Sequence, residues 1–228
     1  MKVFNLRLIW EFFPRIAGYI PVTLVILFAS MVFSLIFGVV FYTIHVKNIP
    51  ALSQIVRIIM SYMRGTPVIT QLFLSYFALP ILLKEIGIDI TRVNGIFFVI
   101  FTYAVYFGAG VSENLRASIA AVGGGQFEAA YAMGMTEFTA FRRIIFPQMI
   151  VAALPNFANI FVRALKNTSL AFSVGVIEMM SMAQLLGSTK QHFTEAYISI
   201  SIIYYAMYLI VIRVFDIIEK SVKKHIMV

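Results

Sequence analysis

Two basic residues directly follow a long uncharged stretch of the sequence, in a position suited to binding an anion. Residues 144–162 carry no charged side chain, and Arg163 and Lys166 come next. Residues three apart share one face of a helix. Charged groups at the depth of a membrane are costly and usually line a polar pathway. These two cations are therefore candidates to hold an anionic group of a solute.

Thr168 and Ser169 extend this candidate site. Both residue types are common at the start of a helix, so we predict that one of them begins a new helix over residues 170–186. The N-terminus of a broken helix that faces a cavity favours a negative charge, which makes a carboxylate the expected ligand. The alternative is structural, with the preceding lysine capping backbone carbonyls or pairing with Glu178 or Glu113.

Other polar side chains within apolar stretches are further candidates for a solute pathway: Thr66, Gln71, Asn156 and Asn159. Pro67 lies between the first two and removes a backbone hydrogen bond, which frees carbonyls that can line the pathway. The alternative for this region is a helix boundary with Arg64 at the lipid headgroups. The alternative for the asparagines is a packing role, because buried amides need hydrogen-bond partners.

Several other chemistries are excluded or unsupported. The absence of Cys excludes disulfides, thiolate metal sites and Cys nucleophiles. The sequence offers neither an H-E-x-x-H motif nor a convergent catalytic set, so we expect neither enzyme activity nor a metal site. Three nearby methionines, Met179, Met180 and Met182, have no Cys or His beside them, and we expect them to fill gaps in packing. The chain also lacks G-x-x-x-x-G-K-[ST], so we expect no nucleotide cofactor in it.

The composition is that of a membrane protein. Of the 228 residues, 61% are hydrophobic and only 12% are charged, whereas a soluble chain is about half apolar and a quarter charged. A membrane helix needs about 20 apolar residues, and the uncharged stretches of about this length are 16–44, 65–83, 93–112, 144–162 and 196–212. They do not alternate as barrel strands do. We predict an all-α integral membrane protein with about five transmembrane helices.

The net charge of +8 fits the same interpretation. Lys and Arg flank the apolar stretches, where they meet lipid headgroups, and no basic face is left over for nucleic acid. Residues 1–15 are amphipathic and are expected to lie on the membrane interface. Residues 16–220 form the predicted transmembrane domain, and residues 221–228 a basic tail that is expected to be cytoplasmic.

Small residues recur within two of the predicted helices. Ser30, Ser34 and Gly38 are spaced four apart in the first predicted helix, and Gly108 and Ser112 have the same spacing in the third. Such spacing lets helix backbones approach one another in a membrane. It indicates a packed bundle.

The least apolar part of the chain, residues 113–143, lies between the third and fourth predicted helices. Its apolar residues still recur at helical spacing, so we predict two short helices joined near Gly134, outside the bilayer. The apolar face of such a pair is free to contact another protein.

Within this loop Glu128, Ala129 and Ala130 are followed at fixed spacing by Gly134, and then by two more matching positions, Ile144 and Pro147. This pattern resembles the EAA loop of ABC-transporter permeases, which reads E-A-A, three residues, G, nine residues, I-x-L-P. Phe146 replaces the usual leucine.

Two further segments narrow the resemblance. Arg64-Gly65-Thr66-Pro67 with Gln71 resembles the R-G-T-P-x-x-x-Q of polar amino-acid permeases, and residues 166–170 resemble their K-[DN]-T-S-L segment. The resemblance covers essentially the whole chain. It is to the histidine/glutamine/arginine/opine group of type I importers.

The resemblance implies a permease fold whose cytoplasmic coupling loop spans about 123–147. It also implies that ATP and Mg are bound by two separate ABC ATPase subunits. The other implied partners are a second permease copy or paralogue and an extracellular binding protein that delivers a polar amino acid. The implied location is the bacterial cytoplasmic membrane, with the N-terminus outside and the C-terminus inside. The alternative function is a passive channel or a stand-alone secondary carrier.

Overall fold

The computed structural model describes residues 4–226, which form helices and no strands. The predicted all-α fold is confirmed. The α-helices are α1 (Leu6–Ala17), α2 (Ile20–Val46), α3 (Leu52–Gly65), α4 (Val68–Phe73), α5 (Leu79–Glu85), α6 (Gly95–Val122), α7 (Gly124–Ala132), α8 (Glu137–Ala140), α9 (Phe146–Asn167), α10 (Met179–Lys190) and α11 (Phe193–Ile226). Residues 1–3 of the expected interfacial segment and 227–228 of the expected tail lie outside the described range.

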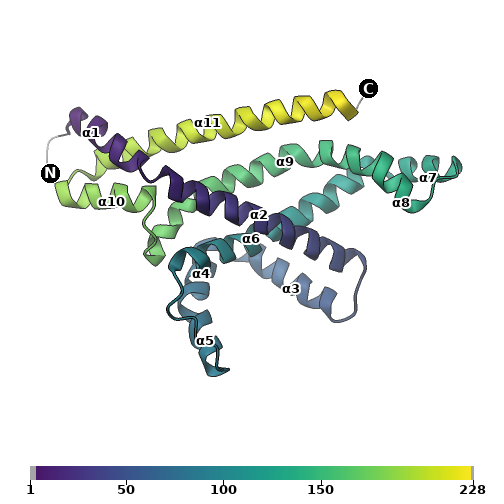
Figure 1. Ribbon diagram of the computed structural model, residues 1–228, viewed down its shortest axis with the longest axis horizontal. Coiled ribbons are helices and arrows are strands. Elements are labelled where there is room, and N and C mark those ends of the chain that lie inside the picture. The colour runs from purple at the N-terminus through teal and green to yellow at the C-terminus, as the bar shows by residue number, and fades with distance from the viewer. Residues whose placement is uncertain (1–3, 227–228) are drawn as a thin grey trace.

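In the described part of the chain, five helical stretches are long and apolar enough to cross a membrane: Ile20–Val46, Val68–Glu85, Gly95–Val122, Glu137–Val174 and Phe193–Lys224. Each contains most of one predicted stretch, so the predicted number of spans is confirmed. α2, α6, α9 and α11 run roughly along the long axis of the molecule, whereas α4 and α5 point away from it (Figure 1). α7, α8 and the C-terminal end of α11 lie at one end, and α1 and α10 lie at the other.

The small residues lie where α2 and α6 pack against each other, which agrees with the predicted packed bundle and adds which two helices meet. Ser30 and Ser34 are fully buried, and Gly38 packs against α6. A Cβ atom on Gly108 would lie 2.8 Å from Cβ of Phe37, so any larger residue at this position would push the helices apart. Tyr103 lies at the centre of the adjoining core, which joins α2, α4, α6 and α9.

The N-terminal helix α1 is anchored at the end of the molecule that also holds α10. Phe12 and Ile16 are fully buried against α10 and α11, while Trp10 remains exposed on the opposite face. Glu11 forms an ion pair with Lys190, whose hydrogen bond lowers the pKa of this carboxyl group. The segment is therefore amphipathic as expected, and part of its apolar face is covered by protein.

Prolines have different effects on different helices. Pro14 lies inside α1, and the turn into α2 is at Gly18 and Tyr19. Two π-helical turns, Leu74–Ala78 and Phe141–Ile145, each end two residues before a proline, Pro80 and Pro147 respectively. Because proline has no N–H group, the hydrogen-bond ladder is interrupted there, and the π turn accommodates the change.

The basic C-terminal segment is a continuation of α11, which runs without a break from Phe193 to Ile226. Lys223 pairs with Glu219 one turn earlier, with 2.5 Å between Nζ and Oε1. The expected boundary at residue 220 is therefore not a boundary in the secondary structure.

Candidate functional site

The polar loop forms the predicted pair of short helices at one end of the molecule (Figure 1). α7 ends at a turn in which Gly134 has φ = 77°, and its next neighbour, Met135, donates to the carbonyl of Ala130 over 3.1 Å. This is the hydrogen bonding of a glycine-terminated helix, and it explains why a glycine is needed there. Thr136 then accepts from the Thr139 amide and begins α8.

The second of the two helices is joined to a membrane-crossing helix. α8 continues through the π-helical turn into α9, so one stretch runs from Glu137 to Val174. Ile144 lies in the π turn, and Pro147 lies in the first turn of α9. Any displacement of the α7–α8 turn would therefore be transmitted directly to α9.

The outer surface of α7 and α8 offers both a charge and apolar side chains. Glu128 and Ala129 are exposed, whereas Ala130 is buried and holds α7 against the rest of the chain. Around Gly134, large apolar side chains face outward: Tyr131, Met133 and Phe138. Met133 is 80% exposed and Phe138 72%. Exposed apolar side chains that gather in one place indicate a contact surface for another protein.

A second candidate site is a polar stripe along α9. Four residues spaced by three, four and three positions lie on one exposed face of this helix: Asn156, Asn159, Arg163 and Lys166. We refer to them as the α9 stripe. Polar groups on a membrane-crossing helix are placed toward a water-filled pathway or a protein partner rather than toward lipid. The structure therefore brings together four of the side chains that the sequence singled out.

Lys166 also lines a cavity beside this stripe. The cavity has a volume of about 640 Å³ and lies between the end of α9, α10 and α11. Ser169 and four tyrosines share it with Lys166: Tyr197, Tyr204, Tyr205 and Tyr208. The Lys166 ammonium lies 5.7 Å from the ring centre of Tyr208. The ion pairs with Glu178 or Glu113 that were considered for Lys166 do not occur, whereas Arg163 lies outside the cavity lining.

The predicted helix start at Thr168 or Ser169 is wrong. The hydroxyl of Thr168 donates to the Leu165 carbonyl over 2.7 Å, and that of Ser169 donates to the Lys166 carbonyl over 2.8 Å. Both side chains therefore bond backward within a continuing helix, which runs on as a 3₁₀ helix over Thr168–Val174. A hydroxyl can cap a new helix or bond to the preceding turn, and its identity alone does not distinguish the two.

The break lies further along, and an internal carboxylate fills it. Gly175 adopts a left-handed conformation, and Glu178 then begins α10. The Glu178 carboxylate accepts from the amides of Met180 and Ser181 over 2.7 and 3.1 Å, and it is fully buried near Thr23. Burial raises the pKa of Glu178 to about 7, although the hydrogen bonds oppose this shift. The helix N-terminus that was expected to hold a ligand carboxylate thus holds one from the chain itself.

Thr66 and Gln71 support the helix-boundary alternative. Pro67 does more than kink a helix, since α3 ends at Gly65 and α4 begins at Val68. The Gln71 amide donates to the Thr66 hydroxyl over 2.8 Å and to the Met63 carbonyl over 3.1 Å, and its side chain is buried. Gln71 therefore ties the two helices together across the break.

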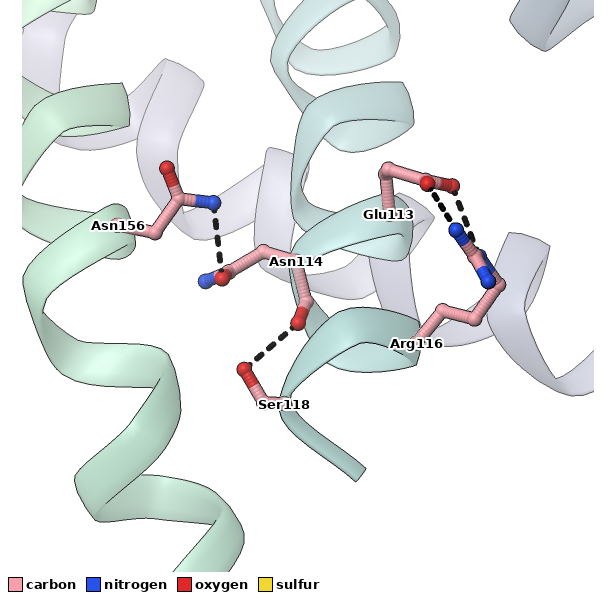
Figure 2. Close-up of polar contacts among 5 residues, drawn as sticks. All are labelled: Glu113, Asn114, Arg116, Ser118 and Asn156. Atoms are coloured by element: carbon pink, nitrogen blue, oxygen red, sulfur yellow. Dashed lines mark hydrogen bonds and ion pairs between the residues drawn. The ribbon is translucent and has the colours of Figure 1, made fainter. Parts of the chain in front are cut away.

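The packing alternative holds for Asn156. Its Nδ2 donates to Oδ1 of Asn114 on α6 over 2.9 Å, and Asn114 in turn donates to the Ala153 carbonyl over 3.0 Å (Figure 2). On the other side of α6, Glu113 and Arg116 form a local ion pair through two contacts of 2.5 and 3.2 Å. Sequence reasoning missed Asn114, although a lone amide near an apolar stretch is the same feature that drew attention to Asn156.

Comparison with known proteins places these features in a family. The described residues form five stretches that can cross a membrane, a polar stripe on one of them and an exposed pair of short helices. A family model described as "Binding-protein-dependent transport system inner membrane component" matches residues 34–224. The chain belongs to this family, whose members are permease subunits of ABC importers and rely on a separate ATPase.

The similarity extends over nearly the whole chain. The "L-cystine transport system permease protein TcyL" of Bacillus subtilis (strain 168) is 39% identical, over 98% of this chain and 94% of its own length. The solved structure titled "Crystal structure of an amino acid ABC transporter with histidines" superposes with a TM-score of 0.84 and 27% identity, over 97% of this chain and 100% of that one. A chain of the MetNI methionine ABC transporter shares the fold, with a TM-score of 0.66 at 18% identity, over 96% of this chain and 99% of that one.

Proposed function

We propose that this permease subunit imports a polar amino acid, or a close derivative of one, by alternating access. The observation that carries the substrate class is the 39% identity with a cystine permease over 98% of this chain. A superposition on an amino-acid ABC transporter with a TM-score of 0.84 supports it. The alternative of a passive channel or carrier does not account for membership in a family of binding-protein-dependent permeases.

Coupling to ATP occurs at α7 and α8 in this proposal. Glu128 and Ala129, with the apolar residues around Gly134, seat on an ABC ATPase subunit that binds ATP and Mg. The α7–α8 turn is held against the N-terminal end of α9 by Ala130, Ile144 and Pro147. Closure of the ATPases therefore tilts α9 and the helices packed on it. The region 123–147 is thus the proposed coupling loop.

The α9 stripe forms one wall of the proposed solute pathway. Lys166 binds the α-carboxylate, and Ser169 and the surrounding tyrosines hydrogen-bond the rest of the solute in the 640 Å³ cavity. Asn159 and Arg163, exposed on the same face, line the continuation of the pathway. Thr66, Gln71, Asn156 and Thr168 keep the helices beside the pathway in place through their hydrogen bonds.

The proposed assembly contains two permease chains, identical or paralogous, two ATPase subunits and an extracellular binding protein. The α7–α8 end and the C-terminus are cytoplasmic, and the N-terminus is outside, in the cytoplasmic membrane of a bacterium. A basic C-terminal segment with Lys220, Lys223 and Lys224 agrees with this orientation.

The substrate class is tested by uptake of a panel of radiolabelled amino acids into proteoliposomes that contain the complete complex and its binding protein. The panel includes cystine. We expect one or a few polar amino acids to accumulate and apolar amino acids not to accumulate. Uptake of none of them by a complex that hydrolyses ATP would contradict the substrate class and leave the permease assignment standing.

A further inference from the structure

A small basic cavity lies apart from the α9 stripe, between α2, α3 and α6. Its volume is about 240 Å³. The polar residues that line it include Tyr42, His45, Arg57, Arg64, Glu113 and Arg116. Three guanidinium groups therefore face one carboxylate, which leaves an excess of positive charge even with a neutral histidine.

The single carboxylate is already engaged. Glu113 is held by both ends of the Arg116 guanidinium group, over 2.5 and 3.2 Å (Figure 2). Within residues 4–226, neither Arg57 nor Arg64 has an ion pair. Arg64 donates only from Nε, to the Met60 carbonyl over 3.2 Å, so its terminal nitrogen atoms remain available. Planar guanidinium groups bind phosphate oxygens with two parallel hydrogen bonds.

The two free arginines share one face of α3. Arg57 and Arg64 are seven residues apart, which is about two helical turns, and both are exposed. Val56 and Met60 on the neighbouring face are buried and fix α3 against the bundle. The arginine positions are therefore set by packing.

The cavity lies at a depth in the membrane where lipid headgroups are found, which favours a lipid phosphate as the anion. Glu113 and Arg116 lie 18 and 21 residues beyond Gly95, the first residue of α6, and so about 27 and 32 Å along the helix axis. The hydrocarbon core of a bilayer is about 30 Å thick, so these side chains are at the boundary between acyl chains and headgroups. Ile55 and Ile58, on other faces of α3 than the two arginines, are exposed, 52% and 63% respectively, as expected of a basic amphipathic helix on a membrane surface.

We propose that this cavity binds a phosphate-bearing anion, and that its occupant is the headgroup of an acidic phospholipid. Arg57 and Arg64 contact the phosphate, and Arg116 stays paired with Glu113 and shapes the wall. The site is at the α7–α8 end of the spans, separate from the proposed solute cavity.

The test is native mass spectrometry of the complete complex, released from nanodiscs that contain either phosphatidylglycerol or phosphatidylcholine. We expect phosphatidylglycerol to be retained and phosphatidylcholine to be lost. Each of Arg57→Gln and Arg64→Gln is expected to weaken retention roughly fivefold, and the double variant roughly 25-fold. Arg92→Gln, at an exposed turn between α5 and α6, is the matched control and should retain lipid normally.

Three outcomes would overturn the proposal. Equal retention by the parent and the double variant would mean that the lipid binds elsewhere. Displacement of phosphatidylglycerol by excess inorganic phosphate would assign the site to a soluble anion. Loss of a protein subunit from the double variant, with lipid retention unchanged, would make the cavity a protein interface. Melting curves of each variant separate these outcomes from misfolding.

Discussion

Gly38 of α2 touches Val111 of α6 so closely that a Cβ atom on Gly38 would lie 2.4 Å from Cγ1 of the valine. The Val111 side chain lies against the Gly38 backbone within two membrane-crossing helices. The helices approach this closely because glycine has no side chain. Gly38→Ala is therefore expected to destabilise the protein by about 1–3 kcal/mol through overpacking.

Gly65→Ala is the matched control for this substitution. A Cβ atom on Gly65 would meet nothing within 4 Å, and this residue ends α3 without a positive φ angle. Thermal unfolding in detergent should show a lower midpoint for Gly38→Ala alone. Equal midpoints for the two variants would contradict the proposed packing of α2 on α6.

The hydrogen bonds of Asn114 predict an asymmetric mutational effect. Asn114 is buried and makes two of these bonds, whereas Asn156 is exposed and makes one. Asn114→Ala leaves the Ala153 carbonyl without this partner and should cost about 1–3 kcal/mol. Asn156→Ala should cost less than about 1 kcal/mol. Chemical unfolding of both variants measures the difference, and a larger loss for Asn156→Ala would be inconsistent with this network.

Glu178 predicts a pH dependence of stability. Burial raises its pKa from an ordinary value of 4.5 to about 7, so between these pH values the folded protein holds a proton that the unfolded chain releases. The free energy of unfolding therefore falls as pH rises from about 4.5 to 7, by on the order of 3 kcal/mol.

Glu178→Gln tests this dependence. The amide cannot ionise, and its oxygen still accepts from the amides of Met180 and Ser181, so the variant should be more stable than the parent at pH 8 and similar to it at pH 5. Unfolding curves across this range provide the measurement. A parent protein whose stability does not change between pH 5 and 8 would refute the burial argument.

Lys166 provides the prediction for the solute cavity. Lys166→Met keeps a long unbranched side chain, one atom shorter, and removes its charge, so uptake should fall at least tenfold, as expected when a charge-assisted hydrogen bond worth about 1.5–3 kcal/mol is lost. Recovery of the ATPase with the permease should not change. Lys84→Met, at the exposed end of α5, is the control. Normal uptake by Lys166→Met would remove this residue from the proposed pathway.

The long-range features of the fold followed from residue patterns. Uncharged stretches predicted the spans because nothing polar can face the hydrocarbon core. The spacing of Ser34, Gly38 and Gly108 predicted a closely packed bundle because backbone approach requires small residues, but it did not predict which helices meet. Gly134 marked the turn between α7 and α8 because a left-handed residue ends a helix.

Features that depend on the direction of a side-chain hydrogen bond, or on partners far away in the sequence, did not follow from residue patterns. The residue types of Thr168 and Ser169 are equally suited to capping a new helix and to bonding to the preceding turn, so the sequence does not tell the two apart. Glu178 begins α10 from a buried position that depends on residues such as Thr23, which is 155 positions away in the chain. The polar stripe of α9 was present in the sequence at helical spacing, but only the packing shows that its face is left exposed.

The central claim is that an ATPase drives this permease through α7. The most direct measurement is ATP-dependent uptake by the reconstituted complex carrying Glu128→Lys, with Glu85→Lys at the end of α5 as a control of equal charge change. We expect that uptake requires ATP, that it is lost in Glu128→Lys and that it persists in Glu85→Lys. Uptake without ATP, or unchanged uptake by Glu128→Lys, would contradict it.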